Sequence, residues 1–359
     1  MKVLVLVEDY PSKSGHEMMY VHVRNKYYVK NKIDVTVLNF RSKEDYKYDG
    51  INVISLNTYN KNSSNYDVLI SHASNLKHHY RFISKFDKKF KKIIFFYHGH
   101  EILKLSEVYP KDYFWIKKSF IKTKLRDIYD NIKFIVWRNK LKKIINKSEL
   151  IFVSNWIYHR FLYYIHLNPI ILENHVHIIN NSVGEVFEKE SYDLRKEKKY
   201  DFITIRGSAL DKGKYGIDIV TELAKNNPKM KFLVVGKGEF YNHVLKPDNI
   251  EFINGYLNHE EMIDYLNKSK CALLPTRQDT QGVMTCEMAT FGIPTITSNI
   301  EVCKEIFCDF DNVLLISNDG KSNLEKPLLN LTKKLPYKKN DKYFAINTIM
   351  KEVDIIKSE

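Results

Sequence analysis

The stretch from Leu273 to Asn299 carries the residues that are best suited to chemistry. A buried strand there ends in a polar loop, and Gly282 in that loop precedes an amphipathic segment that starts at about Val283. A helix that begins just beyond the carboxyl end of a strand presents unpaired backbone N–H groups and the positive end of its dipole, which favour an anion such as phosphate. Two carboxylates, Asp279 and Glu287, bracket this turn. We expect Asp279 in the loop and Glu287 about a turn into the helix.

Basic residues occupy a second loop, near the start of the C-terminal half. Arg206 ends a predicted strand, and Lys212 and Lys214 follow it, next to Gly213 and Gly216. Cations that face a helix N-terminus form a two-sided anion site, in which Arg binds in a bidentate manner and Lys adds a point charge. The pattern predicts a diphosphate ligand. The alternative is a set of ordinary exposed basic residues.

The N-terminal half offers a histidine at a similar position. The predicted strand 93–97 runs directly into His98-Gly99-His100-Glu101. Open α/β sheets bind ligands at the carboxyl ends of their strands, and a glycine there lets a substrate approach the backbone. We interpret His98 as a hydrogen-bonding residue in a substrate cleft. The alternatives are structural histidines or a metal site, for which alternate loop residues supply only a partial ligand set.

Alternating strands and helices must position these groups. We expect strands at 2–7, 33–38, 52–56, 68–71, 93–97, 149–154, 177–181, 201–206, 231–235, 250–253, 271–275, 295–297 and 313–317. We expect helices at 17–29, up to about 164, at 216–226, at 259–269, from about 283, and at 341–357. Gly15 lies at the start of the first of these helices and is a weak ligand-loop signal, since a full G-x-G-x-x-G is missing.

This alternation predicts the α/β class, with two doubly wound domains that face each other across a cleft. A chain of 359 residues is also too long for one typical core. We expect an N-terminal domain at 1–185, a C-terminal domain at 200–335, and a terminal helix within 336–359 that packs back on the N-terminal domain. The polar and charged segment 182–199 is the expected interdomain linker.

Composition limits the partner and the compartment. The formal charge of +14 indicates an anionic partner, which is a nucleic acid, an acidic membrane surface or a phosphorylated ligand. The four cysteines form no C-x-x-C pair and are expected to be buried free thiols, which suits a reducing compartment. The first residues contain no signal-peptide core, and no apolar run approaches the length of a membrane span. We therefore expect a cytoplasmic protein.

The region 104–147 differs from the rest because Lys and Arg alternate there with aromatic residues, which include Tyr113, Trp115, Phe134 and Trp137. This mixture suits one or two amphipathic helices on an anionic bilayer, with the aromatic side chains at the interface. A helical face packed on the domain explains it equally well. Nucleic acid is a third possibility, but no helix-turn-helix, zinc-finger or RNP-type signature accompanies the charge.

The second half resembles the retaining, family 4 type glycosyltransferases of the GT-B fold, or glycosyl transferases group 1. That family has, in order, an arginine, a Lys-Gly pair, Gly-x-Gly, and Pro-Ser-x-x-Glu-Gly-Phe-Gly with a second Glu eight residues after the first. The matching residues here, between about Asp201 and Asn299, are Arg206, Lys212-Gly213, Gly236-Lys237-Gly238, 275–282 and Glu287. The N-terminal half fits more loosely, through Gly15, His98-Gly99, Val153-Ser154 and 177–181.

The resemblance implies a role for each matching residue. Glu287 would accept hydrogen bonds from the ribose hydroxyls of a UDP- or GDP-sugar. The amides around Gly282, Val283 and Met284, with Gly236 nearby, would contact the nucleotide. Arg206 and Lys212 would bind the diphosphate and stabilise the leaving group, with Lys214 competing for the position of Lys212. His98 would lie near the transferred sugar, and Gly15 in a loop that closes on it. No metal or other cofactor is expected.

Asp279 departs from the family pattern, because it replaces a glutamate, and Thr280-Gln281 replaces the usual Gly-Phe. The shorter side chain changes the geometry at the sugar, so a change of donor sugar is a reasonable interpretation.

The expected function is transfer of a sugar to a glycan or polyprenyl-linked acceptor in bacterial surface polysaccharide synthesis. The N-terminal domain would bind the acceptor, and the enzyme would lie on the inner face of the plasma membrane through 104–147, without binding nucleic acid. Two alternatives remain open: a nucleotide-sugar epimerase of the same fold, and a non-enzymatic Rossmann-like protein that binds nucleic acid through its basic surface.

Overall fold

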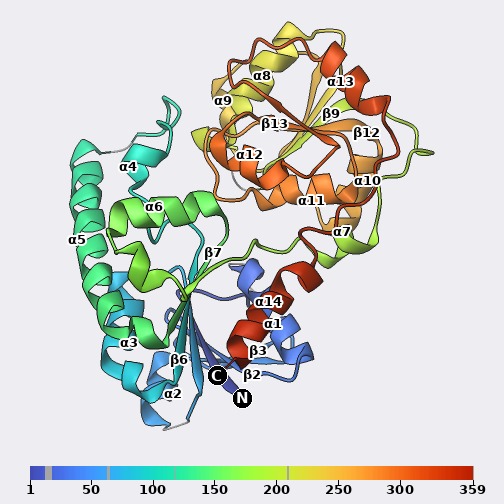
Figure 1. The fold of residues 1–359 in the computed structure, drawn as a ribbon. Helices are drawn as coiled ribbons and strands as arrows, with labels where there is room; N and C mark the ends of the chain where they lie inside the picture. Colours follow the sequence, from blue (N-terminus) through green and yellow to red (C-terminus); the bar gives the residue numbers. More distant parts are fainter. Residues whose placement is uncertain (13–17, 63–64, 118, 208–209, 359) are drawn as a thin grey trace. The chain divides into compact units, whose positions relative to one another are not determined.

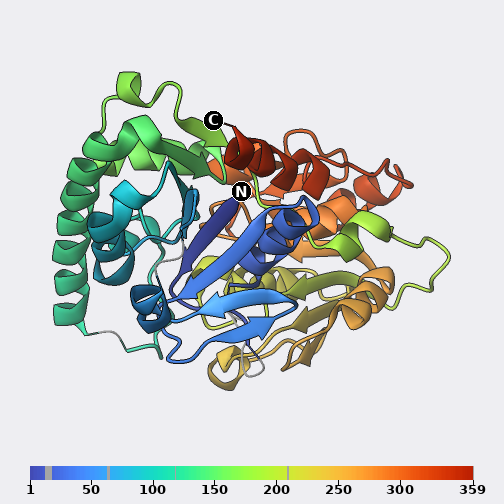
Figure 2. The same cartoon turned by 90° about the horizontal axis from the view of Figure 1, so that it is seen from below.

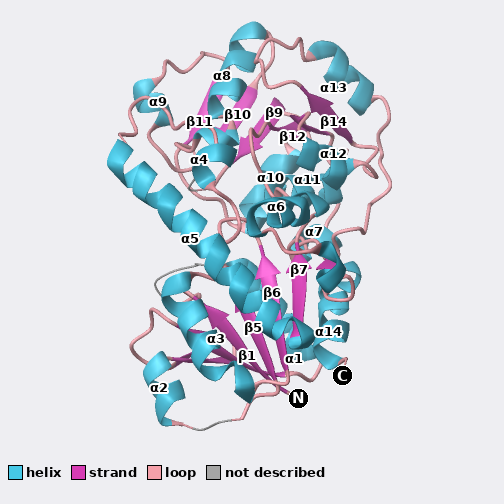
Figure 3. Cartoon of the chain, turned by 60° about the vertical axis from the view of Figure 1, so that its left-hand side comes forward, coloured by secondary structure: helices cyan, strands magenta, loops and turns pink. Residues whose placement is uncertain are grey.

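The computed structural model describes residues 1–12, 18–62, 65–117, 119–207 and 210–358. The chain forms two compact units (Figure 1). The first contains residues 1–105, 121–181 and 345–359, and the second contains 106–120 and 182–344. Each unit is built on one largely or wholly parallel sheet flanked by helices (Figure 3). The fold is therefore of the α/β class, as the sequence predicts.

The sheet of the first unit has the strand order β3-β4-β2-β1-β5-β6-β7-β8. Its strands are β1 (Lys2–Val7), β2 (Asp34–Asn39), β3 (Tyr46–Tyr48), β4 (Ile51–Ile54), β5 (Val68–His72), β6 (Lys92–Tyr97), β7 (Ser148–Phe152) and β8 (Val176–Ile178). All neighbours are parallel except β3 and β4. The central strands are apolar runs with both faces covered, which is why their sequences do not alternate.

The helices of the first unit are α1 (Met19–Lys30), α2 (Leu56–Lys61), α3 (Arg81–Phe86), α5 (Phe120–Ile144), α6 (Asn155–Ile165) and α14 (Ile349–Lys357). Short α4 (Leu105–Val108) leads out of this unit. Single 3₁₀ turns lie at Asp87–Lys89, Ile145–Lys147, Pro169–Leu172 and Ala345–Asn347, and a π turn at Leu76–Tyr80. The expected strand 52–56 is too long, because Ser55 caps α2 by accepting from the Thr58 amide at 3.2 Å.

The sheet of the second unit has the order β11-β10-β9-β12-β13-β14, with every pair parallel. Its strands are β9 (Tyr200–Ile205), β10 (Phe232–Val235), β11 (Ile250–Ile253), β12 (Ser269–Leu274), β13 (Thr295–Ser298) and β14 (Val313–Ile316). Its helices are α7 (Glu185–Lys189), α8 (Ile217–Asn226), α9 (Phe240–His243), α10 (His259–Asn267), α11 (Val283–Phe291), α12 (Glu301–Phe307) and α13 (Glu325–Thr332), with a 3₁₀ turn at Gly213–Tyr215. A capping box of Asn258 and Glu261 starts α10.

The terminal helix α14 packs in the core of the first unit, beside α1 (Figure 1). It contributes Ile349, Val353 and Ile356 to that core. It is shorter than the expected 341–357, because Tyr343 is anchored in the second unit by a bond from its hydroxyl to the Ile306 carbonyl at 2.5 Å. The helix therefore begins only after Thr348.

The segment 182–199 belongs to the second unit, although the sequence suggests a linker there. The α7 helix packs against α11 through Phe187, which is fully buried. Tyr192 also contacts Phe291 and donates to the Ser269 carbonyl at 2.6 Å. This polar and charged segment contains two aromatic residues, Phe187 and Tyr192, that attach it to the second unit. Its polarity therefore does not indicate an interdomain linker.

The cysteines are all free, and Cys271, Cys286 and Cys303 are buried as expected. Cys308 is exposed, which differs from that expectation, because it follows the end of α12.

Candidate active site

The candidate site of the second unit lies where its strand order reverses. β9 and β12 are neighbours at the centre of the sheet, and the strands that follow them lie on opposite sides. Such a switch point leaves a crevice at the carboxyl ends of the strands, where open α/β sheets bind ligands. Arg206 directly follows β9, and Pro275 directly follows β12. The two loops that carry the predicted residues therefore start at this switch point.

Arg206 is buried there, and only part of its hydrogen-bonding capacity is used. Its Nη2 donates to the Pro275 carbonyl oxygen at 2.8 Å. Its Nε is also buried, and it has no hydrogen-bond partner among the described residues. Burial lowers the pKa of this guanidinium, and the negative charge of Asp279 opposes that shift. Because a guanidinium stays protonated in proteins, Arg206 places a positive charge with an unused donor at the switch point.

Lys214 brings a second cation to the same place. Its Nζ lies 4.5 Å from the centre of the Tyr215 ring and 5.0 Å from that of Tyr109. The Arg206 guanidinium lies 5.3 Å from the same Tyr215 ring. Burial disfavours the charge of Lys214, but Tyr215, Tyr109 and Asp279 outweigh this effect, so that its pKa is raised. In the part of the chain that the structure describes, neither cation has an ion-pair partner within 4.0 Å.

Lys212 differs from Lys214 in its surroundings. It is exposed and precedes the 3₁₀ turn at Gly213–Tyr215, whereas Lys214 lies inside that turn. No hydrogen bond or ion pair joins the side chain of Lys212 to a described residue, although its carbonyl accepts from the Tyr215 amide at 3.0 Å. The assignment of Lys212 to the diphosphate stays a prediction, and the geometry gives Lys214 the position next to Arg206.

The helix α11 begins directly after the loop that follows β12, and its N-terminus has no side-chain cap. Gly282 is its N-cap residue and has φ +77°, a conformation that favours glycine. The amides of Val283 and Met284 have no acceptor among the described residues. Asp279 lies beside this turn, because its Oδ1 accepts from the Thr280 amide at 2.8 Å and its Oδ2 is 3.4 Å from a Cβ placed on Gly282. The turn thus combines free amides for an anion with a carboxylate for hydroxyl groups.

Glu287 projects from the second turn of α11. Its Oε1 accepts from the Gly184 amide at 3.3 Å, which is a long hydrogen bond. Burial raises the pKa of this carboxyl group to about 7, and the bond from Gly184 only partly offsets that effect. A partly buried carboxylate with one weak donor gains stability from further donors, such as a pair of hydroxyl groups.

A hydrogen-bond network that the sequence does not predict fixes the loops after β9 and β12. Arg277 binds Asp218 of α8 with two bonds, of 2.8 and 2.5 Å, and its amide donates to the Lys214 carbonyl at 2.7 Å. Tyr113 donates to the same Asp218 at 2.9 Å, which ties the segment 106–120 to the second unit. These partners are far apart in the sequence, so only the fold reveals that they position Lys214.

Gly236 has a structural reason to be glycine. It follows β10 with φ +159°, and a Cβ there would lie 3.0 Å from the Gly207 carbonyl oxygen. The next amide, of Lys237, donates to the same oxygen at 2.6 Å. Gly236 therefore lets the loop after β10 lie against the loop after β9, and its contact with a nucleotide stays a prediction.

His98 follows β6 in the first unit, in a loop that is fixed on several sides. The Glu101 carboxylate accepts from the His98 amide and, at 3.1 Å, from the Gly99 amide. Lys133 of α5 donates to the His100 carbonyl at 3.1 Å. The His98 ring packs against the edge of Tyr20, with centroids 4.7 Å apart, and burial and the charge of Arg24 hold its pKa well below 6.5. His98 is therefore a neutral, rigidly placed hydrogen-bonding group.

Gly15, the predicted ligand-loop residue of the N-terminal half, lies outside the described residues. Among the described ones, no group of three or more His, Cys, Asp or Glu side chains is placed to hold a metal ion. Glu101 of the His-Gly-His-Glu motif is occupied by the backbone amides of its own loop.

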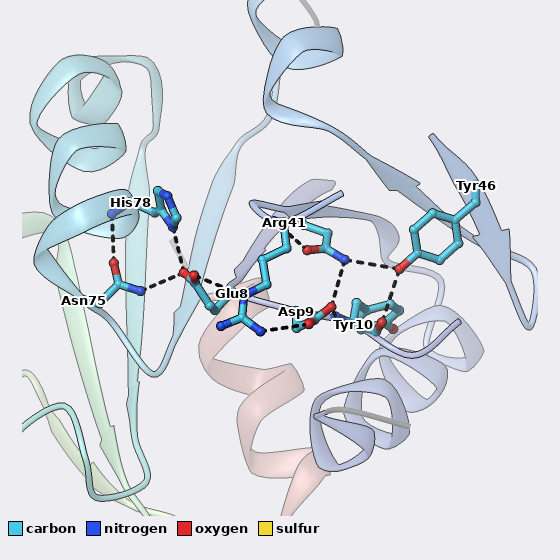
Figure 4. A network of polar contacts seen from close by, with 8 residues as sticks. Glu8, Asp9, Tyr10, Arg41, Tyr46, Asn75 and His78 are labelled. Atoms are coloured by element: carbon cyan, nitrogen blue, oxygen red, sulfur yellow. Dashed lines mark hydrogen bonds and ion pairs between the residues drawn. The ribbon is translucent and has the colours of Figure 1, made fainter. Parts of the chain in front are cut away.

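A polar network at the switch point of the first unit is visible only in the structure (Figure 4). There β1 lies between β2 and β5, and Glu8 follows β1. Glu8 accepts from Asn75 and His78, each at 2.8 Å, and lies 3.5 Å from Arg41, which also pairs with Asp9 at 3.3 Å. The bond to His78 helps to lower the pKa of Glu8 despite burial. This network ties together the loops after β1, β2 and β5.

The second unit is similar in sequence to a known family. Residues 187–344 match the family model of glycosyl transferases group 1, which includes β9 to β14 and all the candidate residues of that unit. Over these residues the chain is similar to the group 1 glycosyltransferases. A curated relative, an O-antigen biosynthesis glycosyltransferase WclY of Escherichia coli, is 30% identical over 101 residues. That match spans 26% of this chain and 27% of the relative.

Solved structures identify the fold of this chain as GT-B. WaaG, a glycosyltransferase involved in lipopolysaccharide biosynthesis, superposes with a TM-score of 0.66 at 13% identity, over 100% of both chains. Anabaena Alr3699/HepE, in complex with UDP and glucose, gives a TM-score of 0.61 at 12% identity, over 99% of this chain and 94% of that one. At such identities the likeness concerns the fold alone.

The basic aromatic region 104–147 divides between the two units. Tyr113 and Trp115 pack on α9 of the second unit, where Trp115 stacks on His243 at 4.7 Å. In α5, the long green helix at the left in Figures 1 and 2, Phe134 and Trp137 are buried in the first unit. The opposite side of α5 exposes an apolar row of Ile121, Leu125, Ile128, Ile132 and Ile135. None of the described helices has the length and apolar character needed to span a membrane.

Proposed function

We propose that this protein transfers a sugar, with retention of configuration, from a UDP- or GDP-sugar to a glycan or polyprenyl-linked acceptor in bacterial surface polysaccharide synthesis. The observation that carries the proposal is the pair of cations at one switch point, the buried Arg206 and the partly buried Lys214, neither of which has an ion-pair partner within 4.0 Å among the described residues. Unpaired buried charges are costly unless a ligand compensates them. A nucleotide diphosphate supplies the missing negative charge.

The donor is assigned by the chemistry of each group. The diphosphate binds Arg206, Lys214 and the free amides of Val283 and Met284, and the ribose hydroxyls donate to Glu287. As the glycosidic bond breaks, negative charge grows on the diphosphate, and these fixed donors stabilise it more strongly than they stabilise the bound substrate. Protein cations thus take the part that a metal plays in other transferases. The complex of HepE with UDP and glucose supports a uridine donor.

The acceptor is assigned to the first unit, where His98 is the proposed contact with the reacting sugars. A neutral imidazole can donate or accept a hydrogen bond to a sugar hydroxyl. The O-antigen enzyme of Escherichia coli and the lipopolysaccharide enzyme WaaG support a cell-surface glycan as product. Asp279 is the proposed contact with the donor sugar, and its short side chain selects among sugars.

A peripheral location on the inner face of the plasma membrane is part of the proposal. The exposed apolar row on α5 recurs every three or four residues from Ile121 to Ile135, which corresponds to about 21 Å of helix. Exposed cations flank the row, among them Lys122, Lys124 and Arg126. An apolar face with cations along its sides suits an anionic bilayer. A second copy of the same helix would instead bring Lys near Lys, which disfavours self-pairing.

Vesicle flotation tests this location. Each buried Leu or Ile contributes about 1 kcal/mol or more, so the Leu125→Gln, Ile128→Gln, Ile132→Gln triple variant should bind vesicles with phosphatidylglycerol on the order of 100-fold more weakly. The matched control changes Leu194, Leu245 and Leu329, which are also exposed, to Gln and should bind as the wild type does. Equal flotation of both triple variants contradicts the assignment to α5.

Sugar transfer is tested with purified protein, a set of UDP- and GDP-sugars, and membrane lipid extract as acceptor. The expected result is a glycosylated lipid or glycan, formed after removal of metal ions with a chelator, with the same anomeric configuration as the donor by proton NMR. An inverted product refutes retention, and conversion of the donor without an acceptor indicates an epimerase.

A further inference from the structure

A second histidine lies directly behind His98. His72, the last residue of β5, is completely buried, and its Nδ1 lies 3.1 Å from Nε2 of His98. The two rings are stacked at 21° with centroids 5.4 Å apart, and Phe96 stacks on His72 at 4.4 Å. The imidazole pair is therefore fixed in both distance and plane.

The hydrogen bond between the rings decides which atom of His98 is left for a ligand. Nε2 of His98 is used by His72, and no described residue bonds to its Nδ1. The partial exposure of His98 contrasts with the complete burial of His72. Nδ1 of His98 is thus the nitrogen that can reach a substrate.

The bond also requires that only one of the two facing nitrogens, Nδ1 of His72 and Nε2 of His98, carries a proton, because an N–H must donate to an unprotonated nitrogen. Burial, in both rings, and the nearby charge of Arg24 hold the pKa of each histidine well below 6.5, and for His72 the neighbouring His98 and His79 act in the same direction. Arg24 is itself buried and paired with Glu352 at 3.0 Å, so its charge is fixed. Since both rings are neutral, their tautomers are coupled: a proton on one side of the bond excludes a proton on the other.

We propose that His72 is a positioning residue for the sugar transfer, which selects one tautomer of His98 and directs Nδ1 of His98 toward the substrate. This inference rests on the proposed function, in which His98 contacts the reacting sugars. His72 itself is buried and touches no substrate. Its effect is to keep the hydrogen-bonding atom of His98 in one place and one protonation state, which avoids an ordering cost during the reaction.

Two substitutions separate positioning from packing. His72→Asn keeps an amide at the place of Nδ1, and this amide can donate or accept toward His98 whichever tautomer is present. His72→Phe keeps a flat ring between Phe96 and His98 but removes the bond. We expect His72→Phe to lower kcat about 10- to 100-fold with little change in the KM for the donor, since the donor site lies in the second unit. His72→Asn, which keeps a bond to His98 but not the choice of tautomer, should have a kcat between those of His72→Phe and the wild type.

A spectroscopic readout keeps this test independent of the activity. Long-range ¹H–¹⁵N correlation spectra should show a single neutral tautomer for His98 in the wild type, and a mixture of tautomers in His72→Phe and in His72→Asn, whose amide can bond to either tautomer. If His72→Phe does not fold, His72→Gln replaces it, because its amide lies at the position of Nε2 and cannot reach His98. The proposal is overturned if His98 has the same tautomer in every variant, or if kcat follows only the loss of thermal stability. Absence of sugar transfer in the wild type would refute the proposed function and leave the spectra to decide the role of His72.

Discussion

The side chains of Arg206 and Lys214 both lie against the Tyr215 ring, and the conformation of the backbone brings them together there. Residue types and spacing predict Arg206, Asp279 and Glu287, since each occupies a fixed place after a strand or in a helix. Spacing alone cannot choose between Lys212 and Lys214. The 3₁₀ turn at Gly213–Tyr215 places Lys214 beside the rings and leaves Lys212 in solvent.

Glu287 should make stability depend on pH. Its pKa is raised from 4.5 to about 7 in the folded protein, so the folded state is destabilised as pH rises from about 4.5 through 7. We expect Glu287→Gln to stabilise the free protein by about 1–3 kcal/mol at pH 8 and by much less at pH 5. Differential scanning fluorimetry at the two pH values measures this difference.

The same substitution should weaken nucleotide binding, because an amide accepts fewer hydrogen bonds from ribose hydroxyls than a carboxylate does. Glu239→Gln, at an exposed carboxylate of the same unit, is the control and should change neither property. A lower Tm for Glu287→Gln at pH 8 would mean that burial does not raise this pKa.

The N-terminus of α11 is the element on which the donor site depends. Gly282 has φ +77° at its N-cap and Gly292 has φ +93° at its C-cap. Alanine at either position should cost about 1 kcal/mol of stability because of the left-handed backbone. Only Gly282→Ala should also weaken nucleotide binding, since its Cβ lies 3.4 Å from Asp279, whereas nothing lies within 4 Å of a Cβ on Gly292.

Thermal unfolding and calorimetric titration of these two variants with UDP and GDP give the comparison. An equal loss of nucleotide affinity in Gly292→Ala would show that the effect comes from general instability of α11 and not from its N-terminus.

Elements differ in how well the sequence predicts them. The strands β1, β5, β9 and β12 are mostly apolar, and their ends are predicted within about two residues. The start of α14 and the role of 182–199 are missed, because Tyr343, Phe187 and Tyr192 act through contacts with distant residues. Such tertiary contacts leave no periodic signal in the sequence.

At the scale of the whole molecule, Arg24 joins two segments of the first unit. One lies just before the chain leaves for the second unit, and the other lies just after it returns. Arg24 donates to Asn181 at 2.7 Å, the last residue before the chain enters the second unit, and pairs with Glu352 of α14, which follows the return. Both members of the ion pair are buried, and Tyr28 donates to Glu352 at 2.5 Å. The length and charge of the chain predict two domains, but they do not predict this shared anchor.

Loss of one partner should therefore destabilise the first unit selectively. Glu352→Ala leaves the Arg24 charge buried and unpaired, which should cost about 3–5 kcal/mol. Hydrogen exchange followed by mass spectrometry should show faster exchange in β1 and β5 and little change in β9 and β12. Asp354→Ala, on the exposed side of the same helix, is the control. Equal effects in both units would contradict an independent core for the first.

The binding of a nucleotide diphosphate to the second unit is the central claim, and isothermal titration calorimetry of UDP, GDP and ADP tests it most directly. The wild type should bind UDP or GDP, Lys214→Met should lose at least about 10-fold in affinity, corresponding to about 1.4 kcal/mol, and Lys212→Met should change it no more than about threefold. Failure of the wild type to bind any of the three nucleotides, or equal binding by wild type and Lys214→Met, would contradict the account.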